Sequence, residues 1–274
     1  LDHLTNGRIA WNVVNSYLPD AQRQGLGLQL EHDERYDRAD EYLDVCYKLW
    51  EQSWDDGAIV LDAANDVHTD PSKVHEIDHH GRWFDVQGPH MVEPSPQRTP
   101  VIFQAGSSAR GMQFASRHGE AVFVAAPQGP AGAELVTQLR ETAAEAGRDP
   151  ASMKIIHATR LIVAETDEQA HAMKAEWDRN FSVEGFLALF GGWTGIDLGG
   201  HSADTPIASI PTTAMRTWVE RWQREDPDHE WTVGDLARRL AEGGAGTAFV
   251  GSATTVADQL EEFADTTGLD GFNL

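Results

Sequence analysis

The chain has 274 residues, of which 44 are acidic and 21 basic, giving a formal net charge of −23. This charge repels nucleic acid and anionic membranes, so neither is expected as a partner. No apolar stretch is long enough to cross a bilayer, and the single cysteine, Cys46, excludes a disulfide framework and a cysteine metal site. These features predict a soluble, cytoplasmic protein.

The first predicted elements are a short buried strand and a long helix. The strand covers residues 8–14 and is followed by a polar cluster that begins at Asn15. From Tyr36 onward, apolar residues recur every three to four positions, as in a helix with one buried face, and Cys46 lies on that face. Residues 51–97 are rich in Asp, Gly, His and Pro and are too long for a plain connection, so they are predicted to be an insertion.

Strands and helices then alternate along the chain. Further strands are predicted at 101–104, 121–125, 155–164 and 271–274, and helices at 109–118, 131–146, 167–181, 233–241 and 256–267. Residues 182–246 interrupt the alternation and are interpreted as a second insertion. The pattern predicts an α/β fold of parallel βαβ units, either a β/α barrel or a doubly wound sheet, and the length allows one large or two small domains.

The stretch QAGSSARG, residues 104–111, joins a predicted strand to a predicted helix. One hypothesis is a simple helix cap, in which serine accepts a hydrogen bond from the first turn and Gly106 supplies the bend. The other is an anion site, because the hydroxyls of Ser107 and Ser108 meet free backbone N–H groups and the positive end of the helix dipole. The residues alone leave both hypotheses open.

Three more polar side chains lie where predicted strands end or helices begin. Asn12 is near the carboxyl end of the first strand, and in a parallel barrel these ends form the active face, although a polar turn would explain it equally well. His32 and Tyr36 are four residues apart at a helix start and therefore share one face. They either cap and staple the helix or present an imidazole and a phenol to one ligand.

A metal site is not expected from His75, His79, His80 and His90. The spacing of His75 and His79 could bind zinc on a helix, but the glycines and proline of residues 81–89 indicate an irregular segment, and no further ligand completes a set. The motifs of nicotinamide, nucleotide-triphosphate and acyl-transfer sites are absent from the sequence.

Four stretches, LDHLTNGRIAWNVVNS, HDERYDRADEYLDVCYKLWE, EPSPQRTPVIFQAGSSARG and TGLDGFNL, together resemble the bacterial luciferase-like flavin monooxygenases. Within that family they resemble the branch of nitrilotriacetate monooxygenase component A and dibenzothiophene-sulfone monooxygenase. The resemblance implies an eight-stranded β/α (TIM) barrel, of which residues 1–274 would supply roughly strands four to eight. The chain is therefore expected to be a fragment of a longer protein, which agrees with its lack of an initiator methionine and its apolar last residues.

The resemblance also implies a function, the large component of a two-component monooxygenase. A separate NADH-dependent flavin reductase would supply reduced FMN, and O₂ would oxygenate a small organic substrate, with C–N or C–S cleavage as a candidate outcome. Gly106, Ser107 and Ser108 would hold the FMN phosphate, His32 and Tyr36 would contact FMN, and Asn12 would lie beside its ring. No catalytic residue is assigned, and a homo-oligomer is expected.

At one point the chain departs from the family pattern. Relatives commonly have Trp-Asn-x-Val-Thr-Ser where this chain has Asn15 in place of the threonine, which leaves the role of Asn15 open. Two alternative functions also stay open: a deazaflavin-dependent oxidoreductase on the same barrel, and a flavin-binding homologue without turnover. The stretch HDERY, followed by the long insertion, favours the FMN branch.

Overall fold

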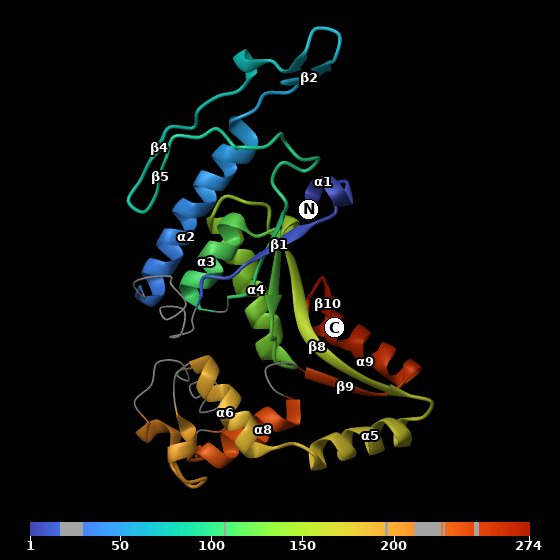
Figure 1. The fold of residues 1–274 in the computed structure, drawn as a ribbon. Helices are drawn as coiled ribbons and strands as arrows, with labels where there is room; N and C mark the ends of the chain where they lie inside the picture. The colour runs from blue at the N-terminus through green and yellow to red at the C-terminus, as the bar shows by residue number, and fades with distance from the viewer. Residues whose placement is uncertain (17–29, 107, 195–196, 211–225, 227, 244–246) are drawn as a thin grey trace. The chain divides into compact units, whose positions relative to one another are not determined.

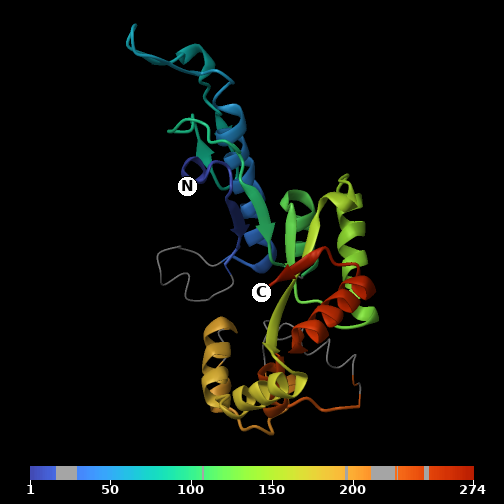
Figure 2. The same cartoon turned by 90° about the vertical axis from the view of Figure 1, so that its right-hand side faces the viewer.

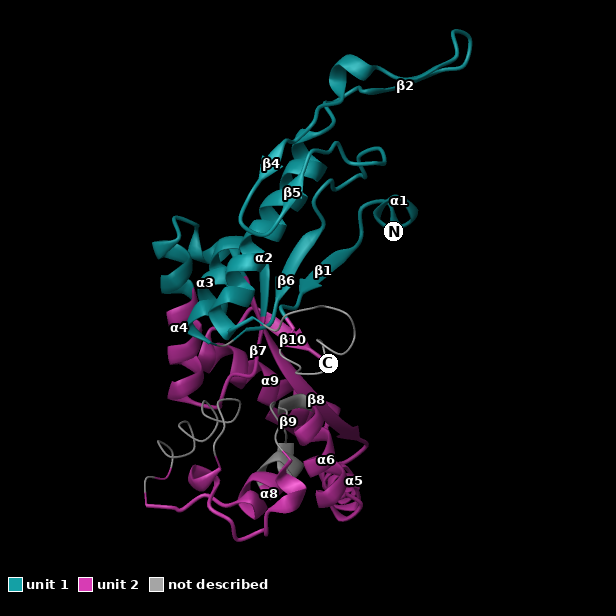
Figure 3. Cartoon of the chain, turned by 60° about the vertical axis from the view of Figure 1, so that its left-hand side comes forward, with its two compact units in different colours: residues 1–15, 30–122, 140–153 teal, residues 16–29, 123–139, 154–274 magenta. Residues whose placement is uncertain are grey.

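The computed structural model describes residues 1–16, 30–106, 108–194, 197–210, 226, 228–243 and 247–274 (Figure 1). The chain divides into two compact units, residues 1–15, 30–122 and 140–153 in the first and residues 16–29, 123–139 and 154–274 in the second (Figure 3). Both contain helices and parallel strands, so the predicted α/β class is confirmed. In the described ranges, no helix is long and apolar enough to span a membrane.

Short parallel strands form the centre of the first unit: β1 (Ala10–Val13), β6 (Val101–Gln104) and the start of β7 (Ala121–Val124). Asn12 of β1 lies opposite Phe103 of β6, which lies opposite Ala121 of β7. β1 is shorter than the predicted strand 8–14. The reason is its partner, since β6 begins only after Pro100, which has no backbone N–H to donate.

Helices α2 (His32–Tyr47) and α3 (Ala109–His118) supply the other half of the first unit's core. Their apolar faces meet the strands in one cluster made of Val13, Tyr36, Leu43, Ile102 and Phe114. Burial of each such side chain contributes about 1.5–3 kcal/mol. Because side chains alternate along a strand, the neighbours of Val13 and Ile102 in sequence point to the opposite face of the sheet.

The segment of residues 51–97 is built from two short hairpins (Figure 1). Strand β2 (Ile59–Asp62) pairs antiparallel with β3 (Val67–Thr69), and β4 (His79–His80) pairs antiparallel with β5 (Asp85–Val86). The carboxylate of Glu41 on α2 accepts hydrogen bonds from the backbone N–H groups of Trp83 (3.0 Å) and Phe84 (2.7 Å). These bonds attach the second hairpin to α2, which is the helix that also carries His32 and Tyr36.

The second unit is organised around the long strand β8 (Lys154–Ala164; Figure 2). Its first half pairs in parallel with β10 (Gly271–Asn273) and its second half with β9 (Thr247–Ser252). Helix α5 (Asp167–Arg179) packs on β8 and β9, and helix α9 (Ala253–Thr267) packs on β9. Ile162, Ala170 and Val250 form an apolar cluster there.

Strand β9 is not among the predicted elements. Its apolar run is short and lies directly after the stretch interpreted as an insertion, and periodicity cannot distinguish such a run from a piece of buried helix. Pairing with β8 makes it a strand and buries Phe249 and Val250. Helix α9 consequently begins at Ala253 and not at 256, with Ser252 as its cap.

The described part of residues 182–246 includes the helices α6 (Val183–Thr194) and α8 (Val233–Gly243), the second of which was predicted at 233–241. Among the described residues this segment has an apolar cluster of its own, made of Phe190, Leu198, Ile207, Ile210, Val233 and Leu236. The segment thus contributes packing of its own within the second unit.

The remaining helical elements in the described part of the chain are short or connect the strands. They are α1 (Asp2–Thr5), α4 (Pro130–Glu145), the π-helical turn at Lys48–Gln52, and the 3₁₀ turns at Pro71–Lys73, Pro150–Ser152, Leu198–Gly200 and Ile207–Ser209. Helix α4 lies within one residue of its predicted bounds at both ends.

Candidate functional site

The turn from β6 into α3 is the centre of the candidate site. Ser108 is the N-cap of α3, and its Oγ accepts a hydrogen bond from the backbone N–H of Gly111 at 3.1 Å. The first i→i−4 bond of the helix runs from Met112 N to Ser108 O at 2.8 Å. The N–H groups of Ala109 and Arg110 precede it and so have no acceptor within the helix, while the Ser108 hydroxyl keeps its own proton to donate.

The hydroxyl of Tyr36 lies directly over this turn. A Cβ atom added to Gly106 or to Gly111 would lie 2.9 Å from Tyr36 Oη, closer than real contacts allow. Both glycines are therefore required by the approach of the phenol, since neither has the positive φ that would itself favour glycine. Tyr36 Oη, Ser108 Oγ and the first N–H groups of α3 converge on one small region of hydrogen-bond donors.

The ring of Tyr36 belongs to the core. Its exposed fraction is 9%, and it packs against Phe114 with ring centroids 5.5 Å apart. Tyr36 and Leu43 pack in the same cluster, so Tyr36 belongs to the buried face of α2 as well as facing the turn. The buried ring holds the hydroxyl in a fixed position over the turn.

The other predicted site residues are placed in different ways. His32 is half-exposed, pairs with Asp33 through Nδ1 at 2.6 Å, and has its ring centroid 5.3 Å from that of Tyr36. Asn12 is exposed and lies on the sheet face opposite Val13, which points into the core. Ser107 lies outside the described residues. Four of the predicted residues thus lie together on the face of the sheet that α2 and α3 cover: Tyr36, Gly106, Ser108 and His32. Asn12 lies on the opposite face of the sheet.

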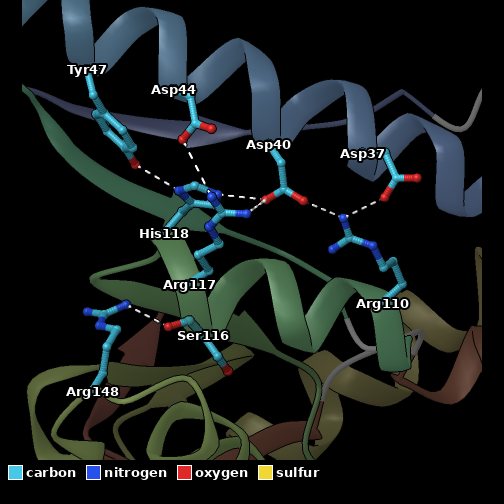
Figure 4. Close-up of polar contacts among 9 residues, drawn as sticks. All are labelled: Asp37, Asp40, Asp44, Tyr47, Arg110, Ser116, Arg117, His118 and Arg148. Carbon is cyan, nitrogen blue, oxygen red and sulfur yellow. Dashed lines mark hydrogen bonds and ion pairs between the residues drawn. The ribbon is translucent and has the colours of Figure 1, made fainter. Parts of the chain in front are cut away.

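A charged network that the sequence analysis did not identify joins α2 to α3 (Figure 4). Asp40 lies between His118, whose Nε2 is 2.7 Å from Oδ1, and Arg110, whose guanidinium bonds Oδ2. Arg110 also pairs with Asp37 at 2.9 Å and lies over the Tyr36 ring, 5.6 Å from its centroid. With two carboxylates as partners, Arg110 acts here as a brace between the helices.

The carboxylate of Asp40 stays ionised at neutral pH. Burial alone would raise the pKa of Asp40, but the hydrogen bonds from His118 and Arg110 outweigh it and hold this pKa below its ordinary value. Since the ionised carboxylate only accepts, His118 donates to it through Nε2, and its Nδ1 is hydrogen-bonded to the Tyr47 hydroxyl at 3.1 Å. Burial raises the pKa of Tyr47 to about 12, so this hydroxyl keeps its proton.

A second turn of similar sequence offers an internal comparison. Strand β9 ends in Gly251-Ser252, and Ser252 caps α9 as Ser108 caps α3, its Oγ accepting from Thr255 N at 3.3 Å. Here Asp167 already occupies the anion position, with Oδ1 accepting from Ser252 N at 2.6 Å and Oδ2 from the Thr255 hydroxyl at 3.1 Å. These bonds lower the pKa of Asp167. The carboxylate of Asp167 thus occupies the second turn, and its negative charge would repel an added anion.

The histidines considered for a metal have other partners. His79 is buried, with Nε2 3.3 Å from Glu41 Oε1 and Nδ1 3.1 Å from Lys48 Nζ, while His75 pairs with Asp55 at 2.9 Å. In the part of the chain that the structure describes, no three His, Cys, Asp or Glu side chains are placed to hold one metal ion.

Gln104, the last residue of β6, is a further site residue that the sequence analysis did not single out. It is 3% exposed, and its Nε2 and Oε1 lie 2.6 and 3.2 Å from the position of a Cβ on Gly106. Its Oε1 is buried without a hydrogen-bond partner among the described residues. The only signal for this in the sequence is its position as a polar residue at the end of an apolar strand.

The residues at the β6–α3 turn fit a phosphate monoester. The glycines leave space beside Tyr36 and Gln104, the donors are neutral hydroxyl and N–H groups, and the helix dipole favours an anion there. Unlike the β9–α9 turn, whose anion position Asp167 fills, this turn presents a buried polar side chain with an unused hydrogen-bonding atom.

Comparisons with known proteins agree with the sequence resemblance. A family model described as luciferase-like monooxygenase matches residues 1–270. The chain is 46% identical to dimethyl-sulfide monooxygenase of Hyphomicrobium sulfonivorans over 100% of this chain and 57% of the relative. It is 38% identical to dibenzothiophene-sulfone monooxygenase of Rhodococcus erythropolis over 99% of this chain and 61% of the relative. It is 34% identical to nitrilotriacetate monooxygenase component A of Aminobacter aminovorans over 100% of this chain and 61% of the relative.

Solved structures show the same likeness. A long-chain alkane monooxygenase superposes with a TM-score of 0.86 at 43% identity, covering 100% of this chain and 59% of the other. A riboflavin lyase solved with modified FMN and its substrate riboflavin superposes with a TM-score of 0.88 at 38% identity, covering 99% of this chain and 60% of the other. The chain therefore spans about three fifths of the length of the relatives it matches.

Proposed function

Since the chain belongs to the luciferase-like monooxygenase family, as its sequence resemblance predicted, we propose that it acts in the oxygenating component of a two-component flavin monooxygenase. In this proposal a separate NADH-dependent flavin reductase delivers reduced FMN, and the substrates are O₂ and a small organic molecule. When bound, reduced FMN supplies the electrons for O₂ activation, which protein side chains do not provide. The names of three relatives, each a monooxygenase of an organic compound, support this reaction type.

The observation that carries the proposal is the convergence of donors at the β6–α3 turn. The Tyr36 hydroxyl, the Ser108 hydroxyl and the first N–H groups of α3 would hold the FMN phosphate, with Gly106 giving it space and Ser107 contributing from the same turn. His32, beside Tyr36, would contact the same ligand. The role of the protein at this end of FMN is to bind and orient it. The ion pair between Asp40 and Arg110 would hold the donors of α2 and α3 in fixed positions relative to one another.

We further propose that the parallel strands belong to a β/α barrel and correspond roughly to its strands four to eight. The 59% coverage of the long-chain alkane monooxygenase structure and the parallel βα units support this. The sheet face that carries Asn12 and Phe103 would then face the barrel interior, which would place Asn12 beside the flavin ring. A homo-oligomer, and a transient complex with the reductase, are part of the same proposal.

The substrate in this proposal is a small organic molecule. The relatives' names include a dialkyl sulfide, an alkane and an aminocarboxylate, so the family allows substrates of quite different polarity. Residues 51–97 and 182–246 are the segments that would select among them, and C–S or C–N cleavage would follow from oxygenation next to the heteroatom. Product analysis on a panel containing a sulfide, an alkane and a tertiary amine would assign the bond that breaks.

The test is FMN titration of the protein and of the double variant Ser107→Ala, Ser108→Ala, followed by an oxygenation assay with a flavin reductase. We expect FMN to bind and the double variant to bind it at least tenfold more weakly, because each hydrogen bond to a charged group is worth about 1.5–3 kcal/mol. Unchanged affinity in the double variant would refute the phosphate assignment. Binding of a deazaflavin in place of FMN, or FMN binding without product from any substrate, would support one of the two alternative functions.

A further inference from the structure

We propose that Gln104 binds a hydroxyl group of the ligand next to its phosphate, so that the β6–α3 turn recognises a polyol phosphate and not phosphate alone. In FMN this group is a hydroxyl of the ribityl chain. The inference rests on the proposed function, since it takes FMN as the ligand of the turn, and it adds a binding residue and a source of selectivity to that site.

The backbone places Gln104 where it can reach the turn. Side chains alternate along β6, so Gln104 shares the face of Ile102, which packs against Tyr36 and Phe114. Gln104 is the last residue of the strand, and two residues later the chain passes Gly106. Its carboxamide therefore lies beside the Tyr36 hydroxyl, since Gln104 Nε2, Tyr36 Oη and Gln104 Oε1 come within 2.6, 2.9 and 3.2 Å of the Cβ position of Gly106.

The unused atom of Gln104 identifies the chemistry of its partner. A buried polar atom without a hydrogen bond costs free energy, so folded proteins rarely keep one without a reason. Oε1 is an acceptor, and it has no donor in the described part of the chain. A phosphate dianion offers acceptors only, whereas a hydroxyl group on the carbon chain that bears the phosphate can donate to Oε1.

Asn15 supplies the complementary atom at the end of the neighbouring strand. Val13 of β1 lies opposite Gln104, and Asn15 follows Val13 by two residues. Its Nδ2 is a buried donor that has no acceptor among the described residues. An unused amide acceptor and an unused amide donor at the ends of two adjacent strands suit a chain of hydroxyl groups, because each hydroxyl both donates and accepts.

A structural role and a ligand-binding role for Gln104 predict opposite effects of its substitution on melting temperature and on ligand affinity. If its carboxamide served only to stabilise the fold, replacing it by an apolar side chain of similar length would lower the melting temperature. The relative affinities for FMN, riboflavin and phosphate would then stay unchanged. If it serves a ligand, Gln104→Met removes a buried atom without a partner, so the free protein should melt at the same temperature or higher while the ligand is lost.

The experiment compares FMN, riboflavin and inorganic phosphate as ligands of the protein and of two variants. For Gln104→Met we expect the dissociation constants of FMN and of riboflavin to rise by about the same factor, on the order of tenfold, since both carry the ribityl chain. The inhibition constant of inorganic phosphate, measured by competition with FMN, should stay within twofold. Gln104→Glu keeps the acceptor and adds a charge, so it should retain riboflavin and lose FMN.

Three outcomes would overturn the inference. The first is unchanged affinity for both flavins in Gln104→Met, and the second is a melting temperature that falls in Gln104→Met while affinity does not. The third is a loss confined to FMN and inorganic phosphate, because Gln104 would then bind the phosphate through Nε2. Failure of the unsubstituted protein to bind FMN would instead overturn the proposed function together with this inference.

Discussion

Replacing Ser108 by alanine separates a helix cap from a phosphate ligand. The hydroxyl of Ser108 accepts from Gly111 N at 3.1 Å and can donate its proton to an anion. Losing the cap costs about 0.5–2 kcal/mol of stability. Losing a hydrogen bond to a charged group costs about 1.5–3 kcal/mol of binding, equivalent to a dissociation constant for FMN about 10- to 150-fold higher.

Ser252→Ala is the matched control. Ser252 caps α9 with a comparable hydrogen bond to Thr255 N at 3.3 Å, but Asp167 occupies the anion position of that turn. Thermal melts should therefore show a similar loss of stability in the two variants, while FMN titration should show weaker binding only in Ser108→Ala. Equal FMN affinities in the two variants would refute the reasoning, since both serines would then be caps and nothing more.

Three other substitutions test the site and the core. Tyr36→Phe should leave the melting temperature within a few degrees, because the ring stays in its cluster, and should weaken FMN binding about tenfold; a large drop in melting temperature without weaker binding would contradict this. Gly106→Ala should weaken FMN binding, because its Cβ would lie 2.9 Å from the hydroxyl of the buried Tyr36 ring; titration showing wild-type affinity would contradict the close approach. Burial lowers the pKa of His157 to about 4, so the unfolded chain takes up a proton that the folded protein does not. Stability should be complete above about pH 6.5 and fall by about 2 kcal/mol on going to pH 5. In denaturant unfolding, His157→Leu should lack this part of the pH dependence, and an unchanged dependence would show that other groups cause it.

Local sequence signals predicted the elements that carry the site. The helix start at His32, the strand at Val101–Gln104 and the helix from Ala109 each follow from a run of apolar residues with a recognisable boundary. Strand β9 was missed because its state depends on pairing with β8, about ninety residues earlier in sequence. Predictions from local pattern fail where a distant partner decides the structure.

The same limit applies to the candidate site. The spacing of His32 and Tyr36 predicted a shared face, and the two rings do lie together. The apolar repeat begins at Tyr36 and so placed it on the buried face, but spacing could not show which residues it packs against there, since Ile102 and Phe114 come from distant segments. Nor could it show that Asp40 joins His118, because the two residues are 78 positions apart.

The most direct test of the central claim is the ratio of the dissociation constants of riboflavin and FMN, which differ only in the phosphate. We predict that the protein binds FMN at least about a hundredfold more tightly than riboflavin, since riboflavin cannot form the two or more hydrogen bonds that the charged phosphate accepts. The double variant Ser107→Ala, Ser108→Ala should bring this ratio most of the way to one. Equal affinities for the two flavins, or a ratio that the double variant leaves unchanged, would contradict a phosphate site at the β6–α3 turn.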